Sequence, residues 1–124
     1  MSMRITEGKG FQMDLPNGVT VSVQFGPGNY CDKQHQAFDA PRVAIENNEH
    51  WEANRAECAA YVTGSHCDWV AVPGFTGRHT DADDAFYDDV CGWLDPQGVL
   101  DFINAAAKCK PQEARHNPIP SHLI

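Results

Sequence analysis

Basic residues are scarce in this chain of 124 residues. Nine Lys and Arg stand against seventeen Asp and Glu, which gives a formal net charge of −8 at pH 7. A protein that binds nucleic acid nonspecifically needs clustered Lys and Arg to neutralise the phosphates. The composition therefore excludes a protein that wraps DNA or RNA through charge alone, and we expect no direct nucleic-acid partner.

Long apolar runs are also missing. A transmembrane helix needs about 18 apolar residues in succession, and no run in this sequence comes near that length. The first ten residues lack the basic start and the apolar core of a signal peptide. We therefore expect neither a membrane span nor an export signal, and we expect the chain to act in a cytoplasm.

Paired cysteine motifs are absent as well. The five cysteines are an odd number without a CxxC pair, which favours reduced thiols that act as small hydrophobic side chains. They are Cys31, Cys58, Cys67, Cys91 and Cys109. The adjacent His66 and Cys67 have no second ligand two to four residues away. We therefore expect no metal site and no cofactor.

Two pairs of apolar stretches predict β-hairpins. Apolar and polar residues alternate over residues 11–15 and 19–25, and Asn17-Gly18 between them offers the positive φ angles of a tight primed turn. Residues 58–62 and 68–72 predict a second hairpin with a longer turn. The connection over residues 26–54 is expected to be loop with room for one short element.

The clearest helical pattern follows Asp95, which is a suitable N-cap, and Pro96, which suits the first helical position. Apolar residues recur at helical spacing, at Val99, Phe102, Ile103 and Ala106. This helix is expected to end near Lys108. Before it, residues 88–94 predict a fifth strand, with a short helix that begins at Thr80 as the alternative.

Together these elements predict one α+β domain over residues 1–110. The expected architecture is an antiparallel sheet of about five strands, with the C-terminal amphipathic helix packed across one face, because that arrangement buries the apolar sides of both. Residues 111–124 contain three prolines and few apolar residues, so they predict an extended tail without a core of its own.

Five carboxylates within nine residues form the densest charge in the sequence: Asp81, Asp83, Asp84, Asp88 and Asp89. An EF-hand loop that begins at Asp81 would need Gly at its sixth position and Glu at its twelfth, where Phe86 and Gly92 stand. The run is therefore either a solvated edge or a docking patch for a basic partner. As a docking patch, a row of carboxylates can imitate the phosphates that nucleic-acid enzymes grip.

A bend at residues 26–28 follows the first hairpin. It lacks the Gly-Lys-Ser/Thr of a nucleotide-binding loop, but it can aim Asn29 and Tyr30 at a partner. The alternative is that Tyr30 closes the end of the sheet. Cys31 with His35 or His79 would be the nucleophile and base of a thiol enzyme, although no motif fixes a base or an oxyanion site around Cys31.

Residues 17–31 read NGVTVSVQFGPGNYC, and this segment resembles the opening of a group of small proteins encoded by tailed bacteriophages and prophages. Members of that group are similar in a later Ala-Glu strand, a tryptophan strand and a helix after an Asp-Pro or Ser-Pro step, which match Ala56-Glu57, Trp69 and Asp95-Pro96 here. The resemblance spans about residues 10–107. Residues 42–54 and the tail after Lys110 depart from it.

The resemblance implies a phage origin and a host-cytoplasm setting, without an established reaction. By analogy with other small acidic phage proteins, we expect a non-enzymatic counter-defence inhibitor that docks on a host immune protein. One alternative is a sponge that sequesters a small nucleotide signal at an oligomer interface, for which few basic residues are available. Another is a small cysteine-dependent enzyme, for which no acid–base pair can be named.

The acidic run generates a first prediction. If it docks on a basic partner, changing Asp83, Asp84 and Asp88 to Asn preserves folding but weakens capture of that partner, and added salt weakens capture by the unchanged protein. A pull-down with both proteins at low and high salt measures the effect. Equal recovery of the partner by both proteins at low salt would contradict docking through these carboxylates.

Overall fold

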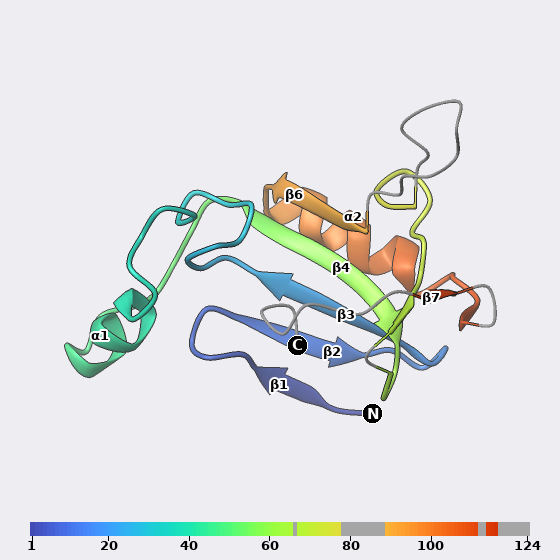
Figure 1. Cartoon of the computed structure of the whole chain (residues 1–124), viewed down its shortest axis with the longest axis horizontal. Coiled ribbons are helices and arrows are strands. Elements are labelled where there is room, and N and C mark those ends of the chain that lie inside the picture. The colour runs from blue at the N-terminus through green and yellow to red at the C-terminus, as the bar shows by residue number, and fades with distance from the viewer. Residues whose placement is uncertain (66, 78–88, 112–113, 117–124) are drawn as a thin grey trace.

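One antiparallel sheet and two helices form the described part of the chain (Figure 1). The structure is a computed structural model that describes residues 1–65, 67–77, 89–111 and 114–116. Its strands are β1 (Met3–Ile5), β2 (Gly10–Asp14), β3 (Val19–Gln24), β4 (Ala56–Val62), β5 (Asp68–Trp69), β6 (Val90–Leu94) and β7 (Arg115–His116). Its helices are α1 (Ala40–Glu46) and α2 (Pro96–Ala106). The predicted α+β class is confirmed.

The sheet is organised around β4. Its strand order is β1-β2-β3-β4-β5-β7, and β6 pairs with β4 outside that order. β4 pairs with β3 along one edge, while its other edge pairs with β6 near Ala56 and with β5 at Tyr61. The described sheet therefore has seven strands: β2, β3, β4, β5 and β6 correspond to the five predicted ones, and β1 and β7 are additional.

The first predicted hairpin is confirmed, but its turn differs from the expected one. Gly18 has a φ of +85°, whereas Asn17 does not have a positive φ. The Gly18 N–H donates to the Leu15 carbonyl at 3.2 Å, and the Leu15 N–H donates to the Val19 carbonyl at 2.7 Å. Pro16 occupies the second turn position, where its fixed φ suits a type I turn. The chain therefore uses a type I turn followed by a left-handed glycine, not a primed turn.

Asn17 instead connects this turn to α2. Its side-chain amide donates to the carbonyls of Ala106 at 2.9 Å and Cys109 at 3.0 Å. The last carbonyls of a helix have no partner within the helix, and this amide donates to that of Ala106, the last residue of α2, and to that of Cys109 in the turn that follows. At the other end, the Asp95 carboxylate accepts from the Gly98 N–H at 2.8 Å, which confirms the predicted N-cap.

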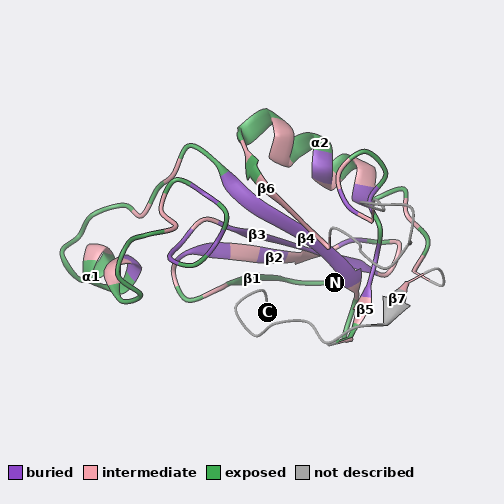
Figure 2. Ribbon diagram, turned by 45° about the horizontal axis from the view of Figure 1, so that its top comes forward, coloured by how far each residue is buried: buried purple, intermediate pink, exposed green. Residues whose placement is uncertain are grey.

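The main core lies between α2 and one face of the sheet. Figure 2 shows β3 and β4 buried along their lengths, and the buried turns of α2 face them. Phe102 and Ala106 are fully buried there, and the Phe102 ring meets Phe75 edge to face at 5.5 Å. The core contains Leu15, Val19, Val21, Val23, Ala56, Cys58, Ala60, Val70, Val72, Phe102 and Ala106. The apolar periodicities of the strands and of the helix therefore meet in one layer.

Several elements differ in extent from the prediction. The second hairpin is confirmed, but β5 has only two residues; beyond it the Val70 N–H still donates to the Ala60 carbonyl at 3.0 Å, and Val70 and Val72 lie in the core. α2 ends at Ala106, two residues before Lys108. β1 was not predicted, and α1 is the short element in the 26–54 connection. In the expected tail, β7 pairs with β5, and the residues after His116 lie outside the described part.

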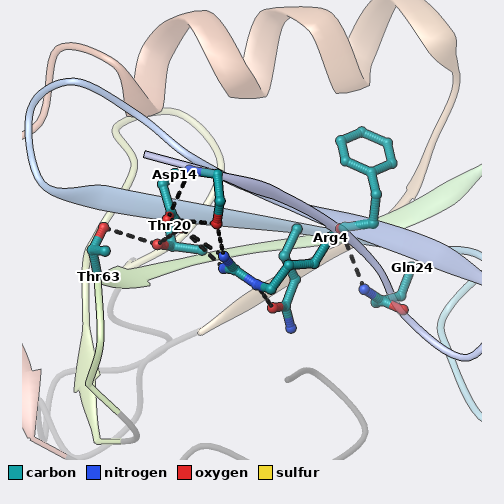
Figure 3. A network of polar contacts seen from close by, with 8 residues as sticks. Arg4, Asp14, Thr20, Gln24 and Thr63 are labelled. Carbon is teal, nitrogen blue, oxygen red and sulfur yellow. Dashed lines mark hydrogen bonds and ion pairs between the residues drawn. The ribbon is translucent and has the colours of Figure 1, made fainter.

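The other face of the sheet carries a polar network that anchors β1 (Figure 3). Arg4 on β1 forms an ion pair with Asp14 on β2 at 2.9 Å. The Thr20 hydroxyl donates to Asp14 at 2.8 Å and lies 2.9 Å from the Thr63 hydroxyl. The bonds from Arg4 and Thr20 hold the pKa of the Asp14 carboxyl well below its usual range. Ionised Asp14 therefore connects three strands and the turn after β4.

Replacing Phe102 by Ala tests the packing of α2. We expect the free energy of unfolding to fall by about 3–5 kcal/mol, because the change leaves a cavity against Phe75 and the sheet. Leu100→Ala, at a half-exposed position of the same helix, is the control and should cost far less. Urea unfolding of both variants measures the difference, and equal losses would contradict the assigned helix face.

Asp14→Asn tests the network on the other face. The folded-state pKa of Asp14 lies below that of the unfolded chain, so the carboxylate stabilises the fold above about pH 4 and this contribution is lost as the pH falls further. We therefore expect Asp14→Asn to be less stable than the unchanged protein at pH 7, with a difference that narrows below about pH 4. Urea unfolding across this pH range measures it. A difference that stays constant with pH would refute the role of the charge.

Candidate binding surface

A β-bulge in β6 displays Trp93. Between two register pairs, β6 advances three residues, from Cys91 to Leu94, while β4 advances two, from Cys58 to Ala56. The extra residue gives Trp93 a φ of +61°, which is uncommon for a non-glycine residue. Bulges redirect side chains, and this one leaves Trp93 45% exposed at the sheet edge.

Groups distant in sequence hold Trp93 in this conformation. Its N–H donates to the Tyr30 carbonyl at 2.9 Å, and the Arg55 guanidinium lies 5.0 Å from the centre of its ring. Arg55 in turn forms an ion pair with Asp32 at 2.6 Å. Gly92 is required for the approach, since a Cβ there would lie 2.4 Å from the Cβ of Tyr30. The bulge and the loop after β3 therefore fit closely against each other.

We call the side chains of Tyr30, Arg55 and Trp93 together the Tyr30–Arg55–Trp93 surface. Tyr30 is 48% exposed and the Arg55 side chain is 49% exposed. Arg55 lies over the Trp93 ring, and the Tyr30 backbone is bonded to that of Trp93. Tyr, Trp and Arg are the residue types most enriched at the energetic centres of protein interfaces. The arrangement is thus suited to contact with another macromolecule.

A buried polar network supports this surface from below. The Lys9 ammonium donates to Asn29 Oδ1 at 3.0 Å, and Asn29 Nδ2 donates to Glu57 Oε1 at 3.2 Å. The other Glu57 oxygen accepts from the Tyr30 N–H at 3.1 Å. Burial lowers the pKa of Lys9. Asn29 therefore bridges two buried groups of opposite formal charge and fixes the backbone on which Tyr30 stands.

Asn29 and Tyr30, the two predicted binding residues after the 26–28 bend, differ in exposure. Asn29 is fully buried, and its side chain bonds to Lys9, Gly26 and Glu57. It cannot contact a partner directly in this conformation, so its part is to position the loop. Tyr30 is half-exposed and is accessible to a partner, as its predicted role requires.

An apolar groove of about 240 Å³ adjoins Arg55. It lies between the sheet and the start of α2, and its lining includes Phe11, Phe25, Leu94, Pro96 and Val99. Apolar pockets with a charged group at the rim accept an apolar side chain from a partner. The groove thus extends the Tyr30–Arg55–Trp93 surface toward the core.

Sequence reasoning missed Arg55 and Trp93. A glycine inside a strand pattern indicates a bulge, so Gly92 carried a usable signal for the display of Trp93. Nothing local connects Arg55 with Asp32 or Trp93, because the three belong to separate segments. Their meeting depends on the pairing of β4 with β6.

Most of the other predicted site residues are not among those that the structure describes. Asp81, Asp83, Asp84 and Asp88 lie outside the described residues, as does Thr80, the start of the alternative helix. Asp89 directly precedes β6 and is half-buried. Docking through the acidic run therefore stays a prediction.

The burial of Cys31 does not favour a role as a nucleophile. Cys31 is almost fully buried, and its thiol donates to the Gly26 carbonyl at 3.4 Å. Burial raises its pKa, whereas a reactive cysteine needs a lowered one. His79 lies outside the described residues.

Within the ranges that the structure describes, no three His, Cys, Asp or Glu side chains are grouped to hold a metal ion. Neither described helix is long and apolar enough to cross a membrane. Comparison of the chain with protein-family models, curated proteins and solved structures gives no match. The phage resemblance therefore stays a prediction, and the geometry of the surface is the basis for a functional proposal.

Asn29→Ala tests the support of the surface. We expect the free energy of unfolding to fall by about 3 kcal/mol, because buried Lys9 and Glu57 both lose a hydrogen-bond partner. Asn54→Ala removes the same side chain at an exposed position and should change stability by less than about 0.5 kcal/mol. Urea unfolding compares the two, and similar values would show that Asn29 has no such supporting role.

Proposed function

We propose that this chain is a non-enzymatic binding protein that docks on a protein partner through the Tyr30–Arg55–Trp93 surface. The resemblance of residues 17–31 to phage accessory proteins supports a setting in the host cytoplasm. In that setting the partner is a host immune protein, and binding blocks its action. The surface geometry carries the binding part of this proposal, and the resemblance carries the setting.

The observation that weighs most is the preorganisation of Trp93. A non-glycine residue with a positive φ costs about 1–3 kcal/mol and persists where its surroundings enforce it. Here the hydrogen bond from the Trp93 N–H to the Tyr30 carbonyl stabilises this conformation, as does Arg55, which lies over the Trp93 ring and is held by its ion pair with Asp32. A side chain that is already fixed loses little entropy on binding, so its contact area contributes more fully to affinity.

The chemistry of the surface describes the partner. The apolar groove beside Arg55 accepts an aliphatic or aromatic side chain, and Tyr30 and Trp93 offer flat apolar area with polar tips. The net charge of −8 steers a basic protein toward this chain. A nucleic-acid-binding immune effector meets both conditions.

Arginine pairing favours a protein partner over a nucleotide signal. Capture of phosphate groups needs unpaired cationic side chains at a pocket. The three arginines whose side chains the structure describes, Arg4, Arg42 and Arg55, each form an ion pair with a carboxylate. The polar pocket of about 370 Å³ beside Arg4 also contains Asp14, which compensates its charge. This pairing removes the described arginines from the case for the nucleotide sponge, which then depends on Lys108 and Lys110 at a pocket of about 420 Å³.

A quantitative pull-down tests the proposal. The bait is the immobilised full chain, and lysate of the bacterial host supplies the partner. We expect one host protein to be recovered in near-stoichiometric amount, and we expect Trp93→Ala to lower its affinity by about 30-fold or more, the effect of losing a contact worth about 2 kcal/mol. Tyr30→Ala should weaken recovery as well.

Leu100→Ala is the matched control, because Leu100 is a half-exposed apolar residue of α2 outside the surface. Circular dichroism establishes that each variant is folded. Recovery that is equal for the unchanged protein, Trp93→Ala and Tyr30→Ala would overturn docking through this surface. Recovery of a nucleotide without any protein, detected by mass spectrometry of the eluate, would favour the sponge instead.

A further inference from the structure

Cys58 and Cys91 lie directly opposite each other on β4 and β6. Opposed residues of an antiparallel pair have Cα atoms about 4.5 or 5.5 Å apart, according to whether the pair is hydrogen-bonded. A disulfide spans Cα separations of about 4.4–6.8 Å. Either arrangement therefore brings these two cysteines within disulfide reach without a change of backbone pairing.

Their side chains also point to the same face of the sheet. Cys58 is fully buried in the core beneath α2, and Cys91 is half-buried and packs against that same core. None of the five cysteines forms a disulfide in the structure, and the other three lie in other parts of the fold. Cys31 donates to the Gly26 carbonyl, Cys109 donates to the Ala71 carbonyl, and Cys67 contacts Ser65 and Asp68 in an exposed turn.

We infer that Cys58 and Cys91 form a site of oxidative modification, which hydrogen peroxide converts to a cross-strand disulfide. The more exposed Cys91 reacts first: its thiol sulfur attacks a peroxide oxygen, the O–O bond breaks, and a sulfenic acid and one water result. The Cys58 sulfur then attacks the sulfenic sulfur, which forms the S–S bond and releases a second water. The two thiols lose two electrons in total, and these reduce one peroxide to two waters.

The surroundings set the rate of this reaction. Burial raises the pKa of the Cys58 thiol well above its usual range, so the attacking thiolate is scarce at neutral pH. Closure is therefore slow, and it accelerates as the pH rises. The pair stays reduced in a reducing cytoplasm and closes under oxidant exposure. The resulting bond ties β6 to β4 at the residue that precedes the bulge.

The test uses the full chain with Cys67→Ser, because exposed Cys67 would otherwise consume oxidant. The folded protein is treated with equimolar hydrogen peroxide, denatured in an alkylating agent and digested without reductant. We expect the four remaining thiols to fall to two, and we expect mass spectrometry to find a peptide pair joined through Cys58 and Cys91. A reductant should restore four.

Cys91→Ser in the same background is the control, and its three thiols should not form a disulfide. A second measurement guards against a control that folds poorly: the oxidised parent should melt at a higher temperature than its reduced form. Four thiols after oxidation, or a disulfide that joins any other pair, would overturn the inference. Neither outcome depends on a binding partner, so this result and that of the pull-down are independent.

Discussion

The pairing of β4 on both of its edges is the constraint on which the rest of this structure depends. β3 lies along one edge, and the other edge is divided between β6 and β5. A strand in this position is buried on both sides, and β4 accommodates this with the small side chains of Ala56, Cys58, Ala59 and Ala60. Small residues on the side of the core leave room for α2, so that Phe102 can lie directly on the sheet.

Glu57 is the exception in β4, and it connects the fold to the candidate surface. A buried carboxylate is costly unless it is hydrogen-bonded and compensated. Here Asn29 and the Tyr30 backbone donate to it, and Lys9 lies on the far side of Asn29. A hydrophobic residue at position 57 could be as stable, but it could not hold the loop that carries Tyr30. The charge thus specifies the geometry of the loop more than it adds stability.

Charge compensation within the molecule also affects the Tyr30–Arg55–Trp93 surface. Arg55 forms an ion pair with Asp32, and its guanidinium lies over the Trp93 ring, so its charge is largely compensated within the molecule. Specificity then depends on aromatic area and on the shape of the groove, while the overall negative charge governs the rate of encounter. The proposed function rests on recognition of a partner by fit at this surface.

Wherever a local pattern carried the information, the sequence predicted the structure. Alternation placed β2 and β3, and the Asp95-Pro96 step placed the start of α2. Helical spacing predicted Phe102 and Ile103 as core; Phe102 is fully buried, whereas Ile103 is partly buried against the core. Local patterns were weaker for β1 and α1, because a strand of three residues and a helix of seven gain their stability from neighbours and not from their own propensity.

Tertiary structure decided the candidate surface. Tyr30 could be singled out from a bend, but the burial of Asn29 and the meeting of Asp32, Arg55 and Trp93 could not. These groups are far apart in the chain, and a single shift of register between β4 and β6 determines whether Trp93 faces outward. Period and capping are properties of neighbouring residues, so sequence determines them. Register between distant strands follows from how the whole core packs, and only the folded chain fixes it.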